Sequence, residues 1–109
     1  MSQAEYAVVF VTAPSLEVAR RVGNDVVEKK LAACANLVPG IESIFHWEGK
    51  IQQEQEVFML LKTQAGLIDD LAAAIRDLHP YSTPEIIALP ILSGSRDYLE
   101  WIGAETTAG

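Results

Sequence analysis

Residues His79 to Glu85, of sequence HPYSTPE, place an imidazole, a phenol, two hydroxyls and a carboxylate in one short connection. Pro80 ends the preceding helical pattern, and Pro84 fixes a second bend before an apolar run. A rigid connection that holds His79 beside Tyr81 suits ligand binding, since both side chains form hydrogen bonds and an imidazole also binds metals. The same residues suit a purely structural role, because a histidine is favoured at a helix C-terminus.

The composition indicates one globular domain over residues 1–109. Half of the 109 residues are hydrophobic and 21% are charged, which is ordinary for a folded domain of this size. We expect an ordered core over about residues 6–102 and a frayed tail over residues 104–109.

The formal net charge of −7 argues against a nucleic-acid partner, because the eight Lys and Arg residues form no basic stripe. An acidic surface keeps a protein soluble and also raises the local concentration of cations.

Cys34 is the only cysteine, which excludes an intramolecular disulfide and a C-x-x-C metal or redox motif. The sequence also lacks a secretory signal pattern and an apolar run of membrane-spanning length. These features predict a cytoplasmic protein without a membrane partner.

Hydrophobic periodicity predicts four strands and three helices. The expected elements are a strand over residues 6–12, a helix over 15–30, a long hairpin over 33–63 that bends at Pro39-Gly40 and turns at Gly49-Lys50, a helix over 67–78, a strand over 86–92 and a last short helix capped by Ser95.

This βαββαβ order predicts an α+β fold, a ferredoxin-like sandwich whose antiparallel sheet has the strand order 4-1-3-2, followed by a C-terminal helix. The continuous apolar runs of the first and third strands place them in the centre of the sheet. Pro90 places the fourth strand at an edge. Residues 41–48 alternate as in a strand, which places Phe45 and Trp47 on one face of the hairpin. The hairpin is longer than two helices can cover, and its end carries Phe45, Trp47 and Ile51. We therefore expect oligomerisation by extension of the sheet between subunits.

Several separated motifs occur together in this chain. They are Lys30 to Asn36 (KLAACAN), Trp47 to Lys50 (WEGK), Leu61 to Thr63 (LKT) and His79 to Glu85 (HPYSTPE). In this order and at these intervals the set resembles the CutA divalent-cation tolerance family, from Tyr6 to Ile102. The resemblance implies a ferredoxin-like homotrimer, similar in architecture to PII-type signalling proteins, with a link to tolerance of copper and other divalent metals.

Metal binding in this chain depends on few soft or borderline ligands. Only His46, His79 and Cys34 offer imidazole or thiolate, so one chain cannot complete a convincing site, whereas a trimer supplies each residue three times. The resemblance implies that His79 and Cys34 bind copper or another divalent ion. Other interpretations make Cys34 a small buried hydrophobe, His46 a solvated side chain and Trp47 an interface residue.

A second candidate function is a PII-like trimeric module that binds a small anionic ligand. The resemblance suggests an intersubunit cleft lined by Lys62, Glu56, Tyr81 and Glu85, although an ion pair near the core is an alternative role for Lys62 and Glu56. No nucleophile elbow, phosphate-binding glycine loop or paired-histidine helix is present, so we expect a protein that is not an enzyme. A scaffold whose assembly is itself the function is a third possibility.

Overall fold

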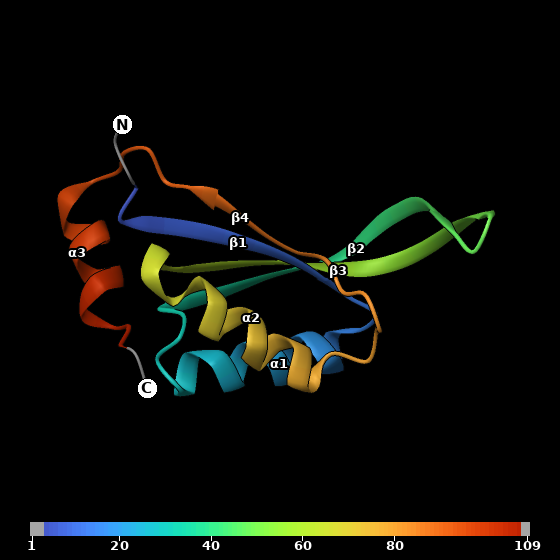
Figure 1. Cartoon of the computed structure of the whole chain (residues 1–109), viewed down its shortest axis with the longest axis horizontal. Helices are drawn as coiled ribbons and strands as arrows, with labels where there is room; N and C mark the ends of the chain where they lie inside the picture. Colours follow the sequence, from blue (N-terminus) through green and yellow to red (C-terminus); the bar gives the residue numbers. More distant parts are fainter. Residues whose placement is uncertain (1–3, 108–109) are drawn as a thin grey trace.

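The computed structural model describes residues 4–107, which form an α+β sandwich (Figure 1). The elements in chain order are β1 (Tyr6–Ala13), α1 (Leu16–Glu28), β2 (Cys34–Trp47), β3 (Lys50–Gln64), the 3-10 helix η1 (Ala65–Leu67), α2 (Ile68–Leu78), β4 (Ile86–Pro90) and α3 (Arg96–Ala104). The strands are antiparallel and lie in the order β2-β3-β1-β4. The predicted fold class and the strand order 4-1-3-2 are therefore confirmed.

The central strands are β1 and β3, as their continuous apolar runs predict. They pair from Tyr6 opposite Gln64 to Ala13 opposite Val57. Alternate residues of both strands face the helices and are buried, as are the helix residues opposite them. The fully buried side chains of this core include Val9, Val11, Met59, Leu61, Leu71 and Ile75. Burial of each such side chain contributes about 1.5–3 kcal/mol.

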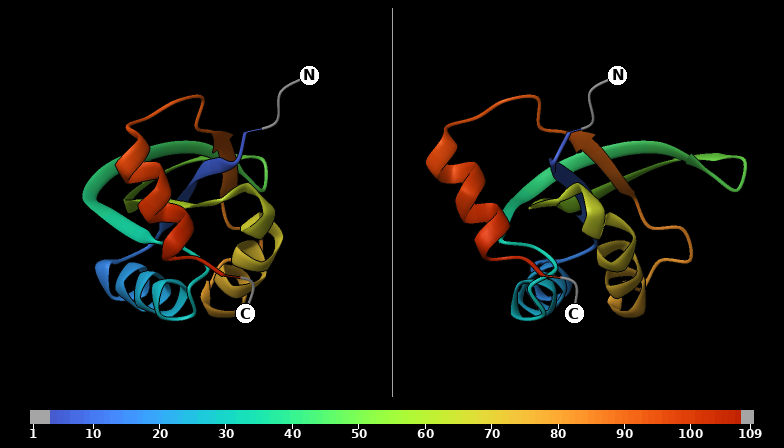
Figure 2. Two further views of the ribbon diagram at one scale, coloured as in Figure 1. Left: turned by 90° about the vertical axis from the view of Figure 1, so that its left-hand side faces the viewer. Right: turned by 60° about the vertical axis from the view of Figure 1, so that its left-hand side comes forward.

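Helices α1 and α2 cover one face of the sheet (Figures 1 and 2). α1 begins after Ser15, whose Oγ accepts a hydrogen bond from the Val18 amide at 3.2 Å. A Cβ at Gly23 would lie 3.3 Å from the Cβ of Ala35, so glycine allows α1 to approach β2 closely. α2 ends at Leu78, two residues before Pro80.

The β2-β3 hairpin projects beyond the helices (Figure 1). Its turn consists of Glu48 and Gly49, one residue earlier than the predicted Gly49-Lys50, because Lys50 already pairs with Trp47. The φ angles of the two turn residues are 51° and 77°, and the second value suits glycine. A bulge between Val38 and Ile41, with φ of 80° at Gly40, confirms the predicted bend. The radius of gyration is 14.4 Å, compared with about 13 Å for a compact domain of this length. The projecting hairpin accounts for this elongation.

The other face of the sheet is only partly covered. α3 stands at the end of the sheet opposite the hairpin tip, where it contacts β1 and β3 (Figure 2). β4 forms the edge beside β1 as predicted, but it ends at Pro90 instead of Leu92, because there it reaches the start of β1: Pro90 pairs with Ala7, and the Ile91 amide donates one last hydrogen bond to the Tyr6 carbonyl at 3.0 Å. Ser95 precedes α3, but its side chain makes no capping bond, contrary to prediction. None of the helices within residues 4–107 is long and apolar enough to cross a membrane.

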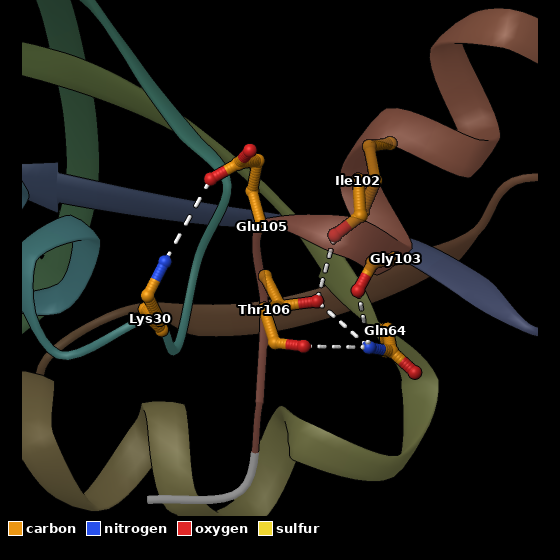
Figure 3. Close-up of polar contacts among 6 residues, drawn as sticks. All are labelled: Lys30, Gln64, Ile102, Gly103, Glu105 and Thr106. Carbon is orange, nitrogen blue, oxygen red and sulfur yellow. Dashed lines mark hydrogen bonds and ion pairs between the residues drawn. The ribbon is translucent and has the colours of Figure 1, made fainter.

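The residues after α3 are anchored, in contrast to the frayed tail expected from residue 104 onward (Figure 3). Thr106 is 1% exposed, and its hydroxyl donates to the Ile102 carbonyl and accepts from Gln64 Nε2. The Thr107 amide donates to the Lys30 carbonyl at 3.0 Å. Periodicity did not indicate these contacts because they join residues far apart in sequence. Residues 108 and 109 lie outside the described part.

Candidate functional site

A groove with a volume of about 910 Å³ runs along the projecting hairpin from its base. The connection between α2 and β4 passes beside this base (Figure 1). The residues that line the groove are Thr12 from β1, Ser43, Ile44, Phe45 and Trp47 from β2, Gln52, Glu54 and Glu56 from β3, and Tyr81, Ser82, Thr83 and Glu85 from the connection.

One face of the hairpin forms a wall of this groove. Ser43 pairs with Glu54, and Phe45 pairs with Gln52, so their side chains project from the same side of the two strands. The bulge after Val38 sets this arrangement, because it shifts the register of β2 against β3 by one residue. An unbulged β2 would turn Phe45 to the opposite face.

Glu56 is the most deeply placed acid of the groove, with only 7% of its surface exposed. The Tyr81 hydroxyl donates to Glu56 Oε2 at 3.1 Å, which connects the hairpin to the α2-β4 connection. Burial, followed by the negative charge of Glu56, raises the pKa of Tyr81 to about 12. The phenol therefore stays protonated and continues to donate this hydrogen bond across the physiological range.

The acids of the groove are close enough to repel one another. Burial raises the pKa of Glu85, and the charge of Glu56 raises it further. Glu54 also contributes to the raised pKa of Tyr81. None of the described residues that line the groove is Lys, Arg or His. The electrostatic potential of the groove therefore favours a cation.

His79 lies behind this groove, with 7% of its surface exposed. Its Nε2 is 2.7 Å from the Thr12 carbonyl oxygen, and its Nδ1 accepts a hydrogen bond from the Tyr81 amide at 3.2 Å. A carbonyl only accepts and an amide only donates, so these partners fix the tautomer with the proton on Nε2. Both ring nitrogens are occupied, so a metal would have to displace one partner.

Cys34 lies at the other end of the sheet, half-buried, and its thiol donates to Asn36 Oδ1 at 3.4 Å. Lys62, which pairs with Cys34 across the strands, donates from Nζ to the same oxygen. Burial and then the Cys34 sulfur raise the pKa of Tyr98 on α3. The protein thus surrounds Cys34 with polar side chains as well as apolar ones.

The structure groups the predicted site residues into two separate places. Glu56, Tyr81 and Glu85 meet in the groove, whereas Lys62 and Cys34 lie together at the level of Val8 on β1. Val8 and Thr12, which His79 contacts, are four residues apart, or about 13 Å along a strand. Residues 4–107 of one protomer contain no group of three His, Cys, Asp or Glu side chains that could hold a metal ion. The described part of one protomer therefore does not provide a complete metal site.

The sequence did not identify Phe45, Gln52 or Thr12 as residues of a site, and it assigned Trp47 to interface packing. The alternation along residues 41–48 placed Phe45 and Trp47 on one face correctly. The register across the bulge, which brings that face to Glu54 and Glu56, depends on pairing and not on local sequence.

Comparison with known proteins identifies the family. The family model described as "CutA1 divalent ion tolerance protein" matches residues 7–105. The chain belongs to the CutA1 family. The resemblance carried by the four sequence motifs is thereby confirmed, and the family name associates the chain with divalent-cation tolerance in general terms.

Members of the CutA1 family with a similar sequence occur in bacteria and plants. The Divalent-cation tolerance protein CutA of Thermus thermophilus is 46% identical over 99 residues, which cover 91% of this chain and 96% of that protein. Protein CutA, chloroplastic, of Arabidopsis thaliana is 46% identical over 99 residues, which cover 91% of this chain but only 54% of that protein. The chain thus spans about half the length of the plant relative.

A solved structure of the family has the same fold. The divalent cation tolerance protein (Cut A1) from Thermus thermophilus superposes with a TM-score of 0.91 at 45% sequence identity, and the match covers 94% of this chain and 99% of that one. The ferredoxin-like arrangement is thus shared along nearly the whole chain.

Proposed function

We propose that this protein binds divalent metal ions as a homotrimer and thereby contributes to metal tolerance or sensing. The observation that carries the proposal is the acidic groove, which Glu54, Glu56 and Glu85 line without converging on one point and which no described basic residue lines. Carboxylate oxygens bind divalent ions, and an added cation would relieve the repulsion between these acids. The family name supports the same function.

Assembly is part of the proposal, because one described protomer does not complete a metal site. At the hairpin end, Ile44 and Ile51 are 69% and 70% exposed, and Ile87 of the edge strand β4 is also exposed. Burial of such surface favours association, and an unpaired strand edge offers hydrogen bonds for sheet extension. A threefold assembly would present every ligand three times.

Copper binding at His79 and Cys34 is the finer form of the proposal. Within one protomer the two residues are too far apart to share an ion, so copies from different subunits must combine. His79 must also release the Tyr81 amide or the Thr12 carbonyl to bind metal. Cys34 needs only to lose a proton and turn away from Asn36.

We further propose that the protein acts in the cytoplasm and without catalysis.

The competing PII-like function, with a small anion in the cleft, places an anion beside Glu56 and Glu85. Lys62, the cation which that model requires, donates to Asn36 at the other end of the sheet. An anion would therefore need Lys62 from a neighbouring subunit.

The test is calorimetric titration of the purified oligomer with manganese(II), copper(II) and, under reducing conditions, copper(I). The variants are Glu56→Gln for the groove and His79→Gln and Cys34→Ser for copper. Glu28→Gln is the matched control, because this exposed residue of α1 loses the same charge far from the groove. The oligomeric state is measured in every sample.

We expect a divalent ion to bind wild type and Glu28→Gln alike and to bind Glu56→Gln more weakly. Copper binding that is lost only in the His79 or Cys34 variant would move the site away from the groove. Equal binding by all variants, or none by the intact oligomer, would contradict the proposal.

A further inference from the structure

The groove has an aromatic wall that a metal ion does not need. Phe45, Trp47 and Tyr81 line it together with the acids. Aromatic rings offer no oxygen, nitrogen or thiolate ligand apart from the Tyr81 hydroxyl, which already donates to Glu56. A divalent ion would therefore leave Phe45 and Trp47 without a role in binding.

The pairing of β2 with β3 brings the aromatic and acidic side chains side by side. Ser43 pairs with Glu54, and Phe45 lies two residues beyond Ser43 on the same face of the hairpin. Side chains that are diagonal neighbours across two strands lie about 7–8 Å apart, within reach of long side chains. Phe45 and Trp47 are 38% and 44% exposed, so their rings remain accessible in the protomer.

Aromatic faces and carboxylates attract the same kind of ligand. The faces of Trp, Tyr and Phe carry negative partial charge and bind ammonium groups. Glu54, Glu56 and Glu85 add full negative charges to the same groove, and no basic described residue lines it. An organic ammonium ion satisfies both features, because its alkyl groups pack on rings while its charge pairs with the carboxylates.

We infer that the groove binds a small organic ammonium ion, with Phe45 and Trp47 against its alkyl groups and Glu54 and Glu56 facing its charge. The volume of about 910 Å³ leaves room for such a ligand, since small-molecule sites commonly measure about 300–1,000 Å³. This inference uses the same groove as the proposed metal function, but it does not require metal binding.

The experiment is an NMR titration of the intact ¹⁵N-labelled protein with tetramethylammonium chloride. The chain has two tryptophans, so its indole N–H signals come from Trp47 and Trp101, and Trp47→Leu assigns them. tert-Butanol serves as the neutral ligand of similar shape, and sodium chloride controls for ionic strength. Backbone amide shifts at Ser82 and Thr83 report binding in the variant that lacks Trp47.

We expect a saturable shift of the Trp47 signal with tetramethylammonium and little shift with tert-butanol or sodium chloride. Trp47→Leu should raise the dissociation constant about three- to thirtyfold. Glu56→Gln should also raise it, whereas Glu28→Gln should not. A response equal to that of tert-butanol, or one unaffected by Glu56→Gln, would overturn the inference.

A neighbouring subunit that fills the groove would also overturn it. In that case tetramethylammonium causes no shift in the oligomer, and Trp47→Leu dissociates the oligomer instead. The two proposals fail separately, because Trp47→Leu should weaken ammonium binding and leave the affinity for manganese(II) unchanged. Ammonium binding without metal binding would refute only the metal function.

Discussion

Replacing His79 with alanine should destabilise the protein whether or not metal is present. The ring is 7% exposed and connects two segments, with Nε2 on the Thr12 carbonyl and Nδ1 on the Tyr81 amide. Alanine removes both hydrogen bonds and leaves both backbone groups without this partner. The α2-β4 connection would thereby lose its attachment to the end of β1.

The size of the effect follows from these contacts. A typical hydrogen bond contributes about 0.5–1.5 kcal/mol net, and an unsatisfied buried group costs about 1–3 kcal/mol. Water entering from the adjacent groove can satisfy part of this loss, since Thr12 also lines the groove. We therefore expect the free energy of unfolding to fall by about 2–4 kcal/mol.

The assay is urea unfolding of the metal-free protein at one fixed protomer concentration, since oligomers unfold in a concentration-dependent way. His46→Ala is the matched control, because His46 is the other histidine and is exposed on the hairpin. We expect it to change stability by less than about 0.5 kcal/mol. A similarly small effect of His79→Ala without metal, together with loss of stabilisation by copper, would refute the structural role and favour His79 as a ligand.

Further expectations concern the groove, the hairpin and the tail. In a variant whose other tyrosines are replaced by phenylalanine, the phenol of Tyr81 should ionise near pH 12, and Glu56→Gln should lower its pKa toward 10, as measured by absorbance at 295 nm. Gly49→Ala should destabilise the hairpin by about 1 kcal/mol or more, because the φ of 77° is strained for alanine; unchanged thermal unfolding would contradict this. Thr106→Val should cost about 1–3 kcal/mol in urea unfolding, since it removes both hydrogen bonds of a buried hydroxyl. Cys34 should react with Ellman's reagent in the native protein, but more slowly than after denaturation; equal rates would show that its burial has no effect.

The sequence by itself determined the element order and the centre of the sheet. Continuous apolar runs in β1 and β3 require cover on both faces, and helical periodicity defines α1 and α2, so these features follow from local pattern. The alternation along the hairpin also placed Phe45 and Trp47 on a common face. Each of these features depends only on residues that are neighbours in the sequence, which is why the sequence alone predicts them.

Only the tertiary structure decided which segments meet. The bulge after Val38 turns the aromatic face of β2 toward Glu54 and Glu56, and the α2-β4 connection brings Tyr81 against Glu56. Likewise Gln64 anchors Thr106 from 42 residues away, which no periodicity indicates. Such contacts depend on strand register and chain direction, which are set by packing of the whole domain and not by any one segment.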